Sequence, residues 1–133
     1  MLLWRAAALH LCVRAGLGVL PFPVLRRLLD RVRRPSQAAL TGPRPRPLRI
    51  ALAVEAASAP LSWSTCLSRA LTAQALLGRY GYAADLRIGV RRGPGGELQA
   101  HAWLVDETGL VLIGDTGDLG GYAQLPPLEG ALP

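Results

Sequence analysis

The sequence contains no lysine, few aromatic residues, and only two cysteines and two histidines. Two cysteines are too few for a disulfide scaffold, and neither Cys12 nor Cys66 stands in a CxxC or CxxH spacing typical of zinc sites. No glycine-rich phosphate-binding loop occurs either. We therefore expect a cytoplasmic protein with free thiols and with no metal or nucleotide cofactor. Cys12 lies in an apolar helical run, and we expect it to be buried.

Uninterrupted apolar runs are missing as well. The first 20 residues are rich in Leu, Ala and Val, but Arg5, His10 and Arg14 interrupt them. A secretory signal needs an unbroken apolar core with a small-residue cleavage site, and a transmembrane span needs about 20 apolar residues in a row. We expect neither, and residues 2–18 predict a packed or interfacial helix.

Acidic residues are scarce in the first part of the chain. Residues 1–49 contain ten Arg and the single acid Asp30, a net charge of +9, whereas residues 50–133 contain five Arg and eight acids, a net charge of −3. This asymmetry predicts contact with an acidic partner, a membrane surface or nucleic acid. Aromatic residues that stack on bases are limited to Trp4 and Phe22 there, so we expect no nucleic acid and keep a peripheral membrane contact open.

The first half predicts two further helices separated by a proline-rich connector. Residues 24–34 place apolar and basic side chains on opposite faces of a helix, and Pro23 suits its first turn. The basic face is either a solvated surface or a binding face for a partner or lipid headgroups. Residues 35–48 contain four prolines and predict an extended connector, and residues 50–57 predict a short helix. The basic face comprises Arg26, Arg27, Arg31, Arg33 and Arg34.

The second half predicts a helix followed by an antiparallel meander, and therefore an α+β fold in which a helix packs on a small sheet. The helix begins at Cys66 and ends near residues 78–81. Alternating apolar residues and the Gly93-Pro94-Gly95-Gly96 turn then indicate a hairpin and a third strand. The residues after Asp118 are expected to be loosely ordered. The predicted strands span residues 84–92, 97–106 and 110–114.

Cys66 stands where a thiol is most reactive, at the junction of a polar loop and an apolar helix. The first N–H groups of a helix and its positive dipole end favour the thiolate, and the same N–H groups can bind an oxyanion. Thr65 is expected to cap this helix. A second oxyanion donor would come from near Trp63 or Ser64.

A thiolate nucleophile needs a base, and the chain offers only His10 and His101. His101 lies on a predicted strand, and Asp115, after the next strand, can approach it to fix the imidazole tautomer. Asp106 and Asp118 are the other acids nearby. On the residues alone, a single Cys and a single His are more often structural than catalytic.

Three stretches resemble the lasso-peptide leader peptidases: PLSWSTCL at residues 60–67, LRIGV at residues 86–90 and AHAW at residues 100–103. These enzymes look like members of the transglutaminase-like, papain-related superfamily. The resemblance implies a Cys-His-Asp protease in which Cys66 is the nucleophile and His101 the base. It assigns the third position to Asp115 and leaves Asp118 open. The family's acidic residue soon after HAW is displaced here, to Asp106.

The resemblance also implies a domain organisation and partners. It places the transglutaminase-like peptidase domain at residues 49–133, after a helical, basic region and connector at residues 1–48. The substrate would be a ribosomally made lasso precursor, held by a separate leader-binding protein (a RiPP recognition element), and a lasso cyclase would act next. Two other hypotheses stay open, a non-catalytic binding module on the same scaffold and an acyltransferase that uses the same Cys and His.

Overall fold

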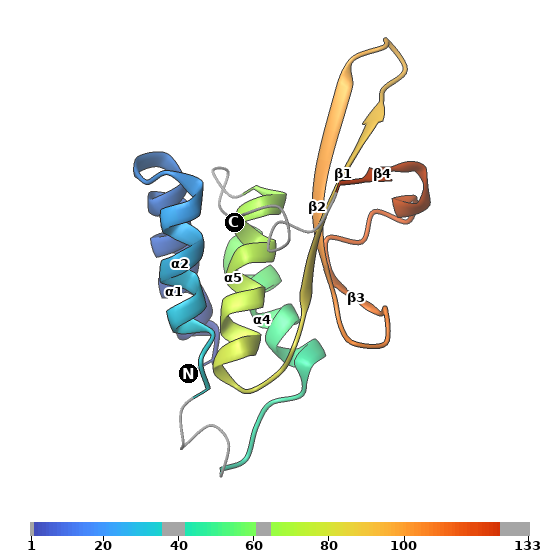
Figure 1. Cartoon of the computed structure of the whole chain (residues 1–133). Helices are drawn as coiled ribbons and strands as arrows, with labels where there is room; N and C mark the ends of the chain where they lie inside the picture. The colour runs from blue at the N-terminus through green and yellow to red at the C-terminus, as the bar shows by residue number, and fades with distance from the viewer. Residues whose placement is uncertain (1, 36–41, 61–64, 126–133) are drawn as a thin grey trace.

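The computed structural model describes residues 2–35, 42–60 and 65–125. These residues form helices, a four-stranded antiparallel sheet and a short 3-10 helix at Leu119–Gly121 (Figure 1). The predicted α+β class is confirmed. The helices are α1 (Leu2–Val19), α2 (Phe22–Val32), α4 (Pro47–Ser58) and α5 (Cys66–Arg79), and the strands are β1 (Asp85–Arg92), β2 (Leu98–Val105), β3 (Val111–Ile113) and β4 (Ala123–Gln124).

Helix α5 is the centre of the fold. It lies between the sheet on one side and α1 and α2 on the other, and α4 packs beside it (Figure 1). A helix that is buried on every side needs small and apolar residues all round, and α5 supplies them. Its residues 70–78 are all buried, among them Leu71, Ala73 and Leu77.

The sheet has the order β3-β2-β1-β4. Strands β1 and β2 form the predicted hairpin, in which Gly89 pairs with His101, and β3 adds to the other side of β2. The prediction of a loosely ordered tail is wrong for residues 119–125. Strand β4 pairs with β1 there, and the Leu125 N–H donates to the Ile88 carbonyl. Aromatic contacts of Tyr122 with His101 and Trp103 explain why residues 119–125 pack against the sheet.

Prolines begin two helices at the positions where their missing N–H groups cost nothing. Pro23 lies in the first turn of α2, as expected. Pro47 does the same for α4, so this helix begins three residues earlier than the sequence pattern predicts. The predicted connector at residues 35–48 is confirmed for residues 42–46, which belong to no helix or strand, and is wrong for residues 47 and 48, which belong to α4. Residues 36–41 lie outside the described part of the chain.

The N-terminal helices share the core of α5. Ala6 and Val13 of α1 and Leu25 and Leu29 of α2 are buried in the same apolar cluster as the α5 residues. By length and composition alone, α1 could cross a membrane, a property it shares with core helices and with signal sequences. The expectation that Cys12 is buried is wrong, because its position on α1 faces solvent.

Arg26 is a second departure from the sequence pattern. The pattern assigns Arg26 to the basic face of α2, but its side chain is buried. Its Nη1 donates to Gln74 Oε1 at 2.9 Å, and Gln74 Nε2 donates to the Ala84 carbonyl at 3.0 Å. These bonds satisfy polar groups that would otherwise be costly to bury, and they tie α2 to α5 and to the start of β1.

Candidate active site

The start of α5 positions the thiol of Cys66. Thr65 is the N-cap, as predicted, and its Oγ1 accepts from the Ser68 N–H at 3.1 Å. In return the Thr65 N–H donates to Ser68 Oγ at 2.9 Å, which completes a capping box. Cys66 is therefore the first helical residue, and its thiol is half-buried. The thiol therefore lies at the positive end of the helix dipole.

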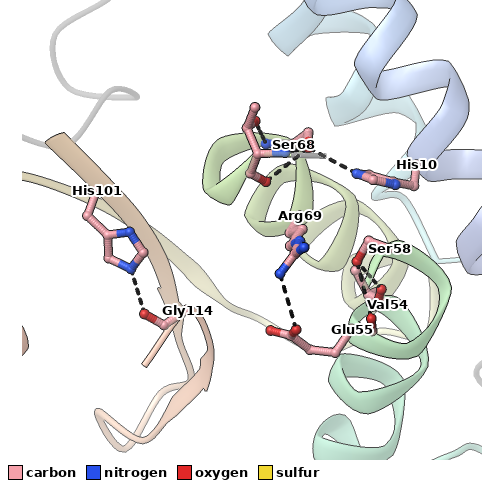
Figure 2. A network of polar contacts seen from close by, with 9 residues as sticks. His10, Val54, Glu55, Ser58, Ser68, Arg69, His101 and Gly114 are labelled. Carbon is pink, nitrogen blue, oxygen red and sulfur yellow. Dashed lines mark hydrogen bonds and ion pairs between the residues drawn. The ribbon is translucent and has the colours of Figure 1, made fainter. Parts of the chain in front are cut away.

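A buried histidine from α1 supports this cap. Ser68 Oγ lies 2.9 Å from His10 Nε2 and 3.0 Å from the Thr65 carbonyl (Figure 2). Because the Ser68 hydroxyl proton is directed to that carbonyl, the His10 ring donates to Ser68. Burial lowers the pKa of His10, and the positive charges of Arg69 and Arg14 lower it further. His10, the histidine of the chain that does not line the pocket, thus supports the helix that carries Cys66.

His101 is held by a backbone carbonyl. Its Nε2 lies 2.6 Å from the Gly114 oxygen, and the ring N–H donates to it (Figure 2). This bond leaves Nδ1 as the nitrogen that can accept and return a proton. The ring also stacks on Trp103 at 6.0 Å between centroids and contacts Tyr122 at 5.8 Å. The imidazole is therefore fixed both in tautomer and in orientation.

Gly114 supplies that carbonyl from a tight turn after β3. Its φ of +88° lies in the left-handed region that favours glycine. A Cβ on Gly114 would stand 2.9 Å from the Ala102 oxygen and 3.0 Å from Trp103 Cβ. Sequence reasoning missed Gly114, although a glycine directly after a strand and before Asp115 was a usable signal for a special backbone position.

The two candidate acids occupy different places. Asp115 lines the same pocket as His101, and within the described part of the chain its hydrogen bond comes from the Gly117 N–H at 2.8 Å. Asp118 points elsewhere: it accepts from the Thr116 hydroxyl at 2.6 Å and forms an ion pair with Arg91. Both interactions lower the pKa of Asp118, the hydroxyl bond first.

Asp106 lies in the turn between β2 and β3. Its carboxylate accepts from the Thr108 side chain and from the backbone of that turn, and the Thr108 hydroxyl is the first cause that lowers the pKa of Asp106. The pocket therefore contains only Asp115 of the three acids considered, and the role of Asp115 as orienting acid stays a prediction.

One pocket, of about 410 Å³, brings the predicted residues together. This size fits a binding site for a short peptide segment or a small ligand. It also contains an ion pair that sequence reasoning missed: Arg69 Nη1 lies 3.6 Å from Glu55 Oε2, with both side chains about one third exposed (Figure 2). Arg69 follows Cys66 by three residues and so shares its helix face, which was the available signal. The lining residues are Glu55, Cys66, Arg69, His101, Ile113, Gly114, Asp115 and Thr116.

This arrangement can support covalent catalysis by a thiol. A thiol at a helix start, an imidazole fixed by its second nitrogen and the N–H group of the first helical residue are the parts that acyl transfer needs. The second oxyanion donor that the sequence placed near Trp63 or Ser64 lies outside the described residues. Within the described residues, no three side chains of His, Cys, Asp or Glu are grouped so that they could hold a metal ion.

Comparison with known proteins gives one family. The model of the Transglutaminase-like superfamily matches residues 7–126, which include Cys66, His101 and Asp115, the whole of α2 and all of α1 except its first five residues. Comparison with curated proteins and with solved structures gave no match. The matched segment covers most of the chain, and its α+β fold packs the helix that begins at Cys66 against an antiparallel sheet. The chain therefore belongs to the transglutaminase-like superfamily.

Proposed function

We propose that this protein is a cysteine peptidase that removes the leader from a lasso-peptide precursor. The observation that carries the proposal is that Cys66, at the capped start of α5, and His101, held by the Gly114 carbonyl, line one pocket. The superfamily includes cysteine proteases and transferases, which supports thiol chemistry at this site. The lasso-peptide substrate rests on the sequence stretches around Cys66, Gly89 and His101.

The reaction begins with acylation. His101 Nδ1 accepts the Cys66 proton, and Sγ attacks the carbonyl carbon of the leader–core peptide bond. The Cys66 backbone N–H, at the helix start, stabilises the oxyanion of the tetrahedral intermediate. When this intermediate collapses, the C–N bond breaks and the imidazolium gives its proton to the departing amine. The core peptide leaves with a free N-terminus, and the leader stays bound to Cys66 as a thioester.

Hydrolysis completes the cycle. His101, neutral again, accepts a proton from water, and the hydroxide attacks the thioester carbon. The intermediate collapses, the C–S bond breaks and Cys66 leaves as a thiolate that recovers the proton from His101, and the leader departs as a carboxylic acid that loses its proton to solvent. The neutral Gly114 carbonyl keeps the imidazole in one tautomer throughout, and we propose that Asp115, beside it in the pocket, stabilises the imidazolium through its negative charge.

Substrate selection requires more than this pocket. We propose that a separate leader-binding protein presents the precursor and that a lasso cyclase consumes the free N-terminus of the core in the cytoplasm. The Glu55–Arg69 pair at the pocket edge offers charges of both signs to residues around the cleaved bond. Because both groups are partly exposed, either can exchange its partner for a substrate charge at small cost.

A reconstituted cleavage assay tests the proposal. Precursor, leader-binding protein and this chain are incubated together, and the leader and core are quantified by mass spectrometry. Cys66→Ala and His101→Ala should each lower the rate by at least about 10³-fold, because the nucleophile and base act as one unit. Cys12→Ala is the matched control, since Cys12 is exposed on α1 and lies outside the pocket; it should cleave as the wild type does.

The same assay separates the other hypotheses. If Cys66→Ala, shown by circular dichroism to be folded, cleaves at near the wild-type rate, the protease proposal is wrong. If the chain binds precursor but neither cleaves it nor reacts rapidly with iodoacetamide at Cys66, it is a binding module. If an added amine, in place of water, receives the leader acyl group, the chain is an acyltransferase.

A further inference from the structure

Helix α1 exposes an uncharged stripe along its whole length. Ala6, His10 and Val13 face the core, and the side opposite them faces solvent. Trp4 is 73% exposed, Leu11 59% and Val19 81%. We call this surface the outer stripe; its exposed residues are Trp4, Ala8, Leu11, Cys12, Ala15, Gly18 and Val19.

A continuous exposed apolar stripe is expected to contact another molecule or a membrane. A surface helix normally has a polar face toward water, whereas a helix that is apolar on all sides is normally buried on all sides or lies in lipid. Helix α1 is apolar on both faces, yet among the residues that the structure describes only its inner face is covered. A continuous exposed apolar surface on a monomeric chain marks a contact with a partner or with a membrane.

The charges beside the outer stripe indicate what covers it. Helix α2 packs on the same side of α5 as α1, and Gly16 of α1 lies against Leu25 of α2. The solvent side of α2 carries the exposed Arg27 and Arg31, and the exposed Arg34 follows two residues after the helix. The one acid in this half, Asp30, is paired with Arg33 at 3.3 Å. The solvent-exposed sides of these two neighbouring helices thus offer an apolar stripe on α1 and an excess of positive charge on and just after α2.

This combination matches an anionic lipid surface. Interfacial helices bury an apolar face about 5–10 Å deep at the headgroup boundary, and flanking Arg residues bind anionic headgroups. A tryptophan near the end of such a helix suits the membrane interface. We propose that α1 and α2 dock the protein on an anionic membrane, with α1 in the plane of the interface. The inner face of α1 stays on α5, so the helix lies on the membrane and does not cross it.

The docked orientation leaves the pocket accessible. Helix α1 lies on the side of α5 away from the sheet (Figure 1). The residues that line the pocket belong to α4, α5, β2, β3 and the turn after β3. Membrane binding and thiol chemistry can therefore be measured separately. Cleavage of a soluble precursor should be unaffected by changes in the outer stripe.

Vesicle binding tests the proposal. The full chain is sedimented with vesicles of phosphatidylcholine alone, or of phosphatidylcholine with about 30% phosphatidylglycerol, at low and high salt. We expect binding to the anionic vesicles, weaker at high salt because exposed charges are screened within about 10 Å at 0.1 M. Trp4→Glu with Leu11→Glu, and separately Arg27→Glu with Arg31→Glu and Arg34→Glu, should each weaken binding at least about tenfold.

Two matched controls lie on the sheet. Leu98 of β2 is 71% exposed and Arg92 of β1 is exposed, so Leu98→Glu and Arg92→Glu repeat the same chemical changes away from the outer surface. Both should bind vesicles as the wild type does. In a Cys66→Ala background, a polarity-sensitive dye on Cys12 should shift to the blue when anionic vesicles are added.

Three results would overturn the proposal. The first is a wild-type chain that stays in the supernatant with anionic vesicles. The second is a stripe or arginine variant that binds vesicles as tightly as the wild type. The third is a wild-type chain that does not bind vesicles, together with stripe variants that lose either binding to the leader-binding protein or self-association. That result would show that the outer stripe contacts a protein.

Discussion

The two sides of α5 differ in how their charges are compensated. On the sheet side, Arg91 pairs with Asp118, and Arg69, at the edge of the pocket, pairs with Glu55. On the helical side, the first 49 residues carry a net charge of +9, and most of the arginines of α2 face solvent. The sheet side thus pairs its arginines within the chain and contains the pocket, whereas the helical side leaves most of its arginines exposed to solvent, which is the basis of the proposed membrane contact.

One of the contacts between α1 and α5 reaches the active site. His10, from α1, donates to Ser68, and Ser68 closes the cap that positions Cys66. The helical side therefore supports the nucleophile without entering the pocket. The variants below test how far the roles of the two sides are separate, beginning with the one expected to have the largest effect.

Gly114→Ala should damage the site most. The new methyl group would meet the Ala102 carbonyl and Trp103 at about 3 Å, and the φ of +88° disfavours any side chain. Relief of this clash moves the carbonyl that holds His101, and we expect a loss of at least about 10²-fold in kcat, because small displacements of a base are costly. Gly117→Ala is the matched control: its φ is +83° but no atom lies within 4 Å of the new methyl group. Equal losses for both variants would contradict this role of Gly114.

His10→Ala should weaken the link between the two sides. It leaves buried polar atoms at Ser68 without the imidazole and opens space in the core, so we expect the free energy of unfolding to fall by about 1–3 kcal/mol. His10→Gln, which can still donate to Ser68, should recover part of the loss. Urea denaturation followed by circular dichroism measures both. An unchanged stability in His10→Ala would show that the contact is dispensable.

The same histidine should make stability depend on pH. Because burial lowers the pKa of His10, the folded chain binds this proton less tightly than the unfolded chain, whose His titrates near pH 6.5. The contribution of neutral His10 is complete above about pH 6.5 and is lost as the pH falls from 6.5 toward its folded pKa. The stability of His10→Gln should therefore decline less than that of the wild type between pH 7 and pH 5, measured as the urea midpoint. If the urea midpoints of the wild type and of His10→Gln fall equally between pH 7 and pH 5, the loss of stability comes from groups other than His10.

Asp115→Asn should have a smaller effect than Gly114→Ala. The Gly114 carbonyl fixes the tautomer of His101 by itself, so removal of the Asp115 charge should lower kcat about tenfold, by destabilising the imidazolium. Asp118→Asn should change cleavage least, because Asp118 lies outside the pocket and its pair with the partly exposed Arg91 is screened by solvent. If Asp118→Asn loses most of its activity and Asp115→Asn keeps its activity, then Asp118, not Asp115, is the acid that acts with His101.

The features that the sequence predicts well are those encoded by neighbouring residues. The cap at Thr65, the helix from Cys66 and the β1–β2 hairpin follow from local patterns of turn, cap and alternating residues, and all three are confirmed. The resemblance around Cys66 and His101 likewise marked two residues that the fold brings into one pocket, although they are 35 positions apart in the printed sequence.

The features that the sequence did not predict depend on distant partners. The burial of Arg26 depends on Gln74, 48 positions away, and the order of β4 depends on contacts of Tyr122 with the β2 aromatic residues. The group that holds His101 is a backbone carbonyl, which no side-chain motif can reveal. Cys12 was assigned to the core because its helix is apolar, yet the exposed side of that helix is apolar as well.

The central claim is that Cys66 is the nucleophile, and the covalent intermediate tests it most directly. Precursor, leader-binding protein and enzyme are mixed and quenched in acid within the first turnover, and the digested enzyme is analysed by mass spectrometry. We predict a thioester adduct, with the mass of the leader, on the peptide that contains Cys66 in the wild type and in Cys12→Ala, and no adduct in Cys66→Ala. Cleavage in the first turnover with no adduct on Cys66, or with the adduct on Cys12, would contradict the account.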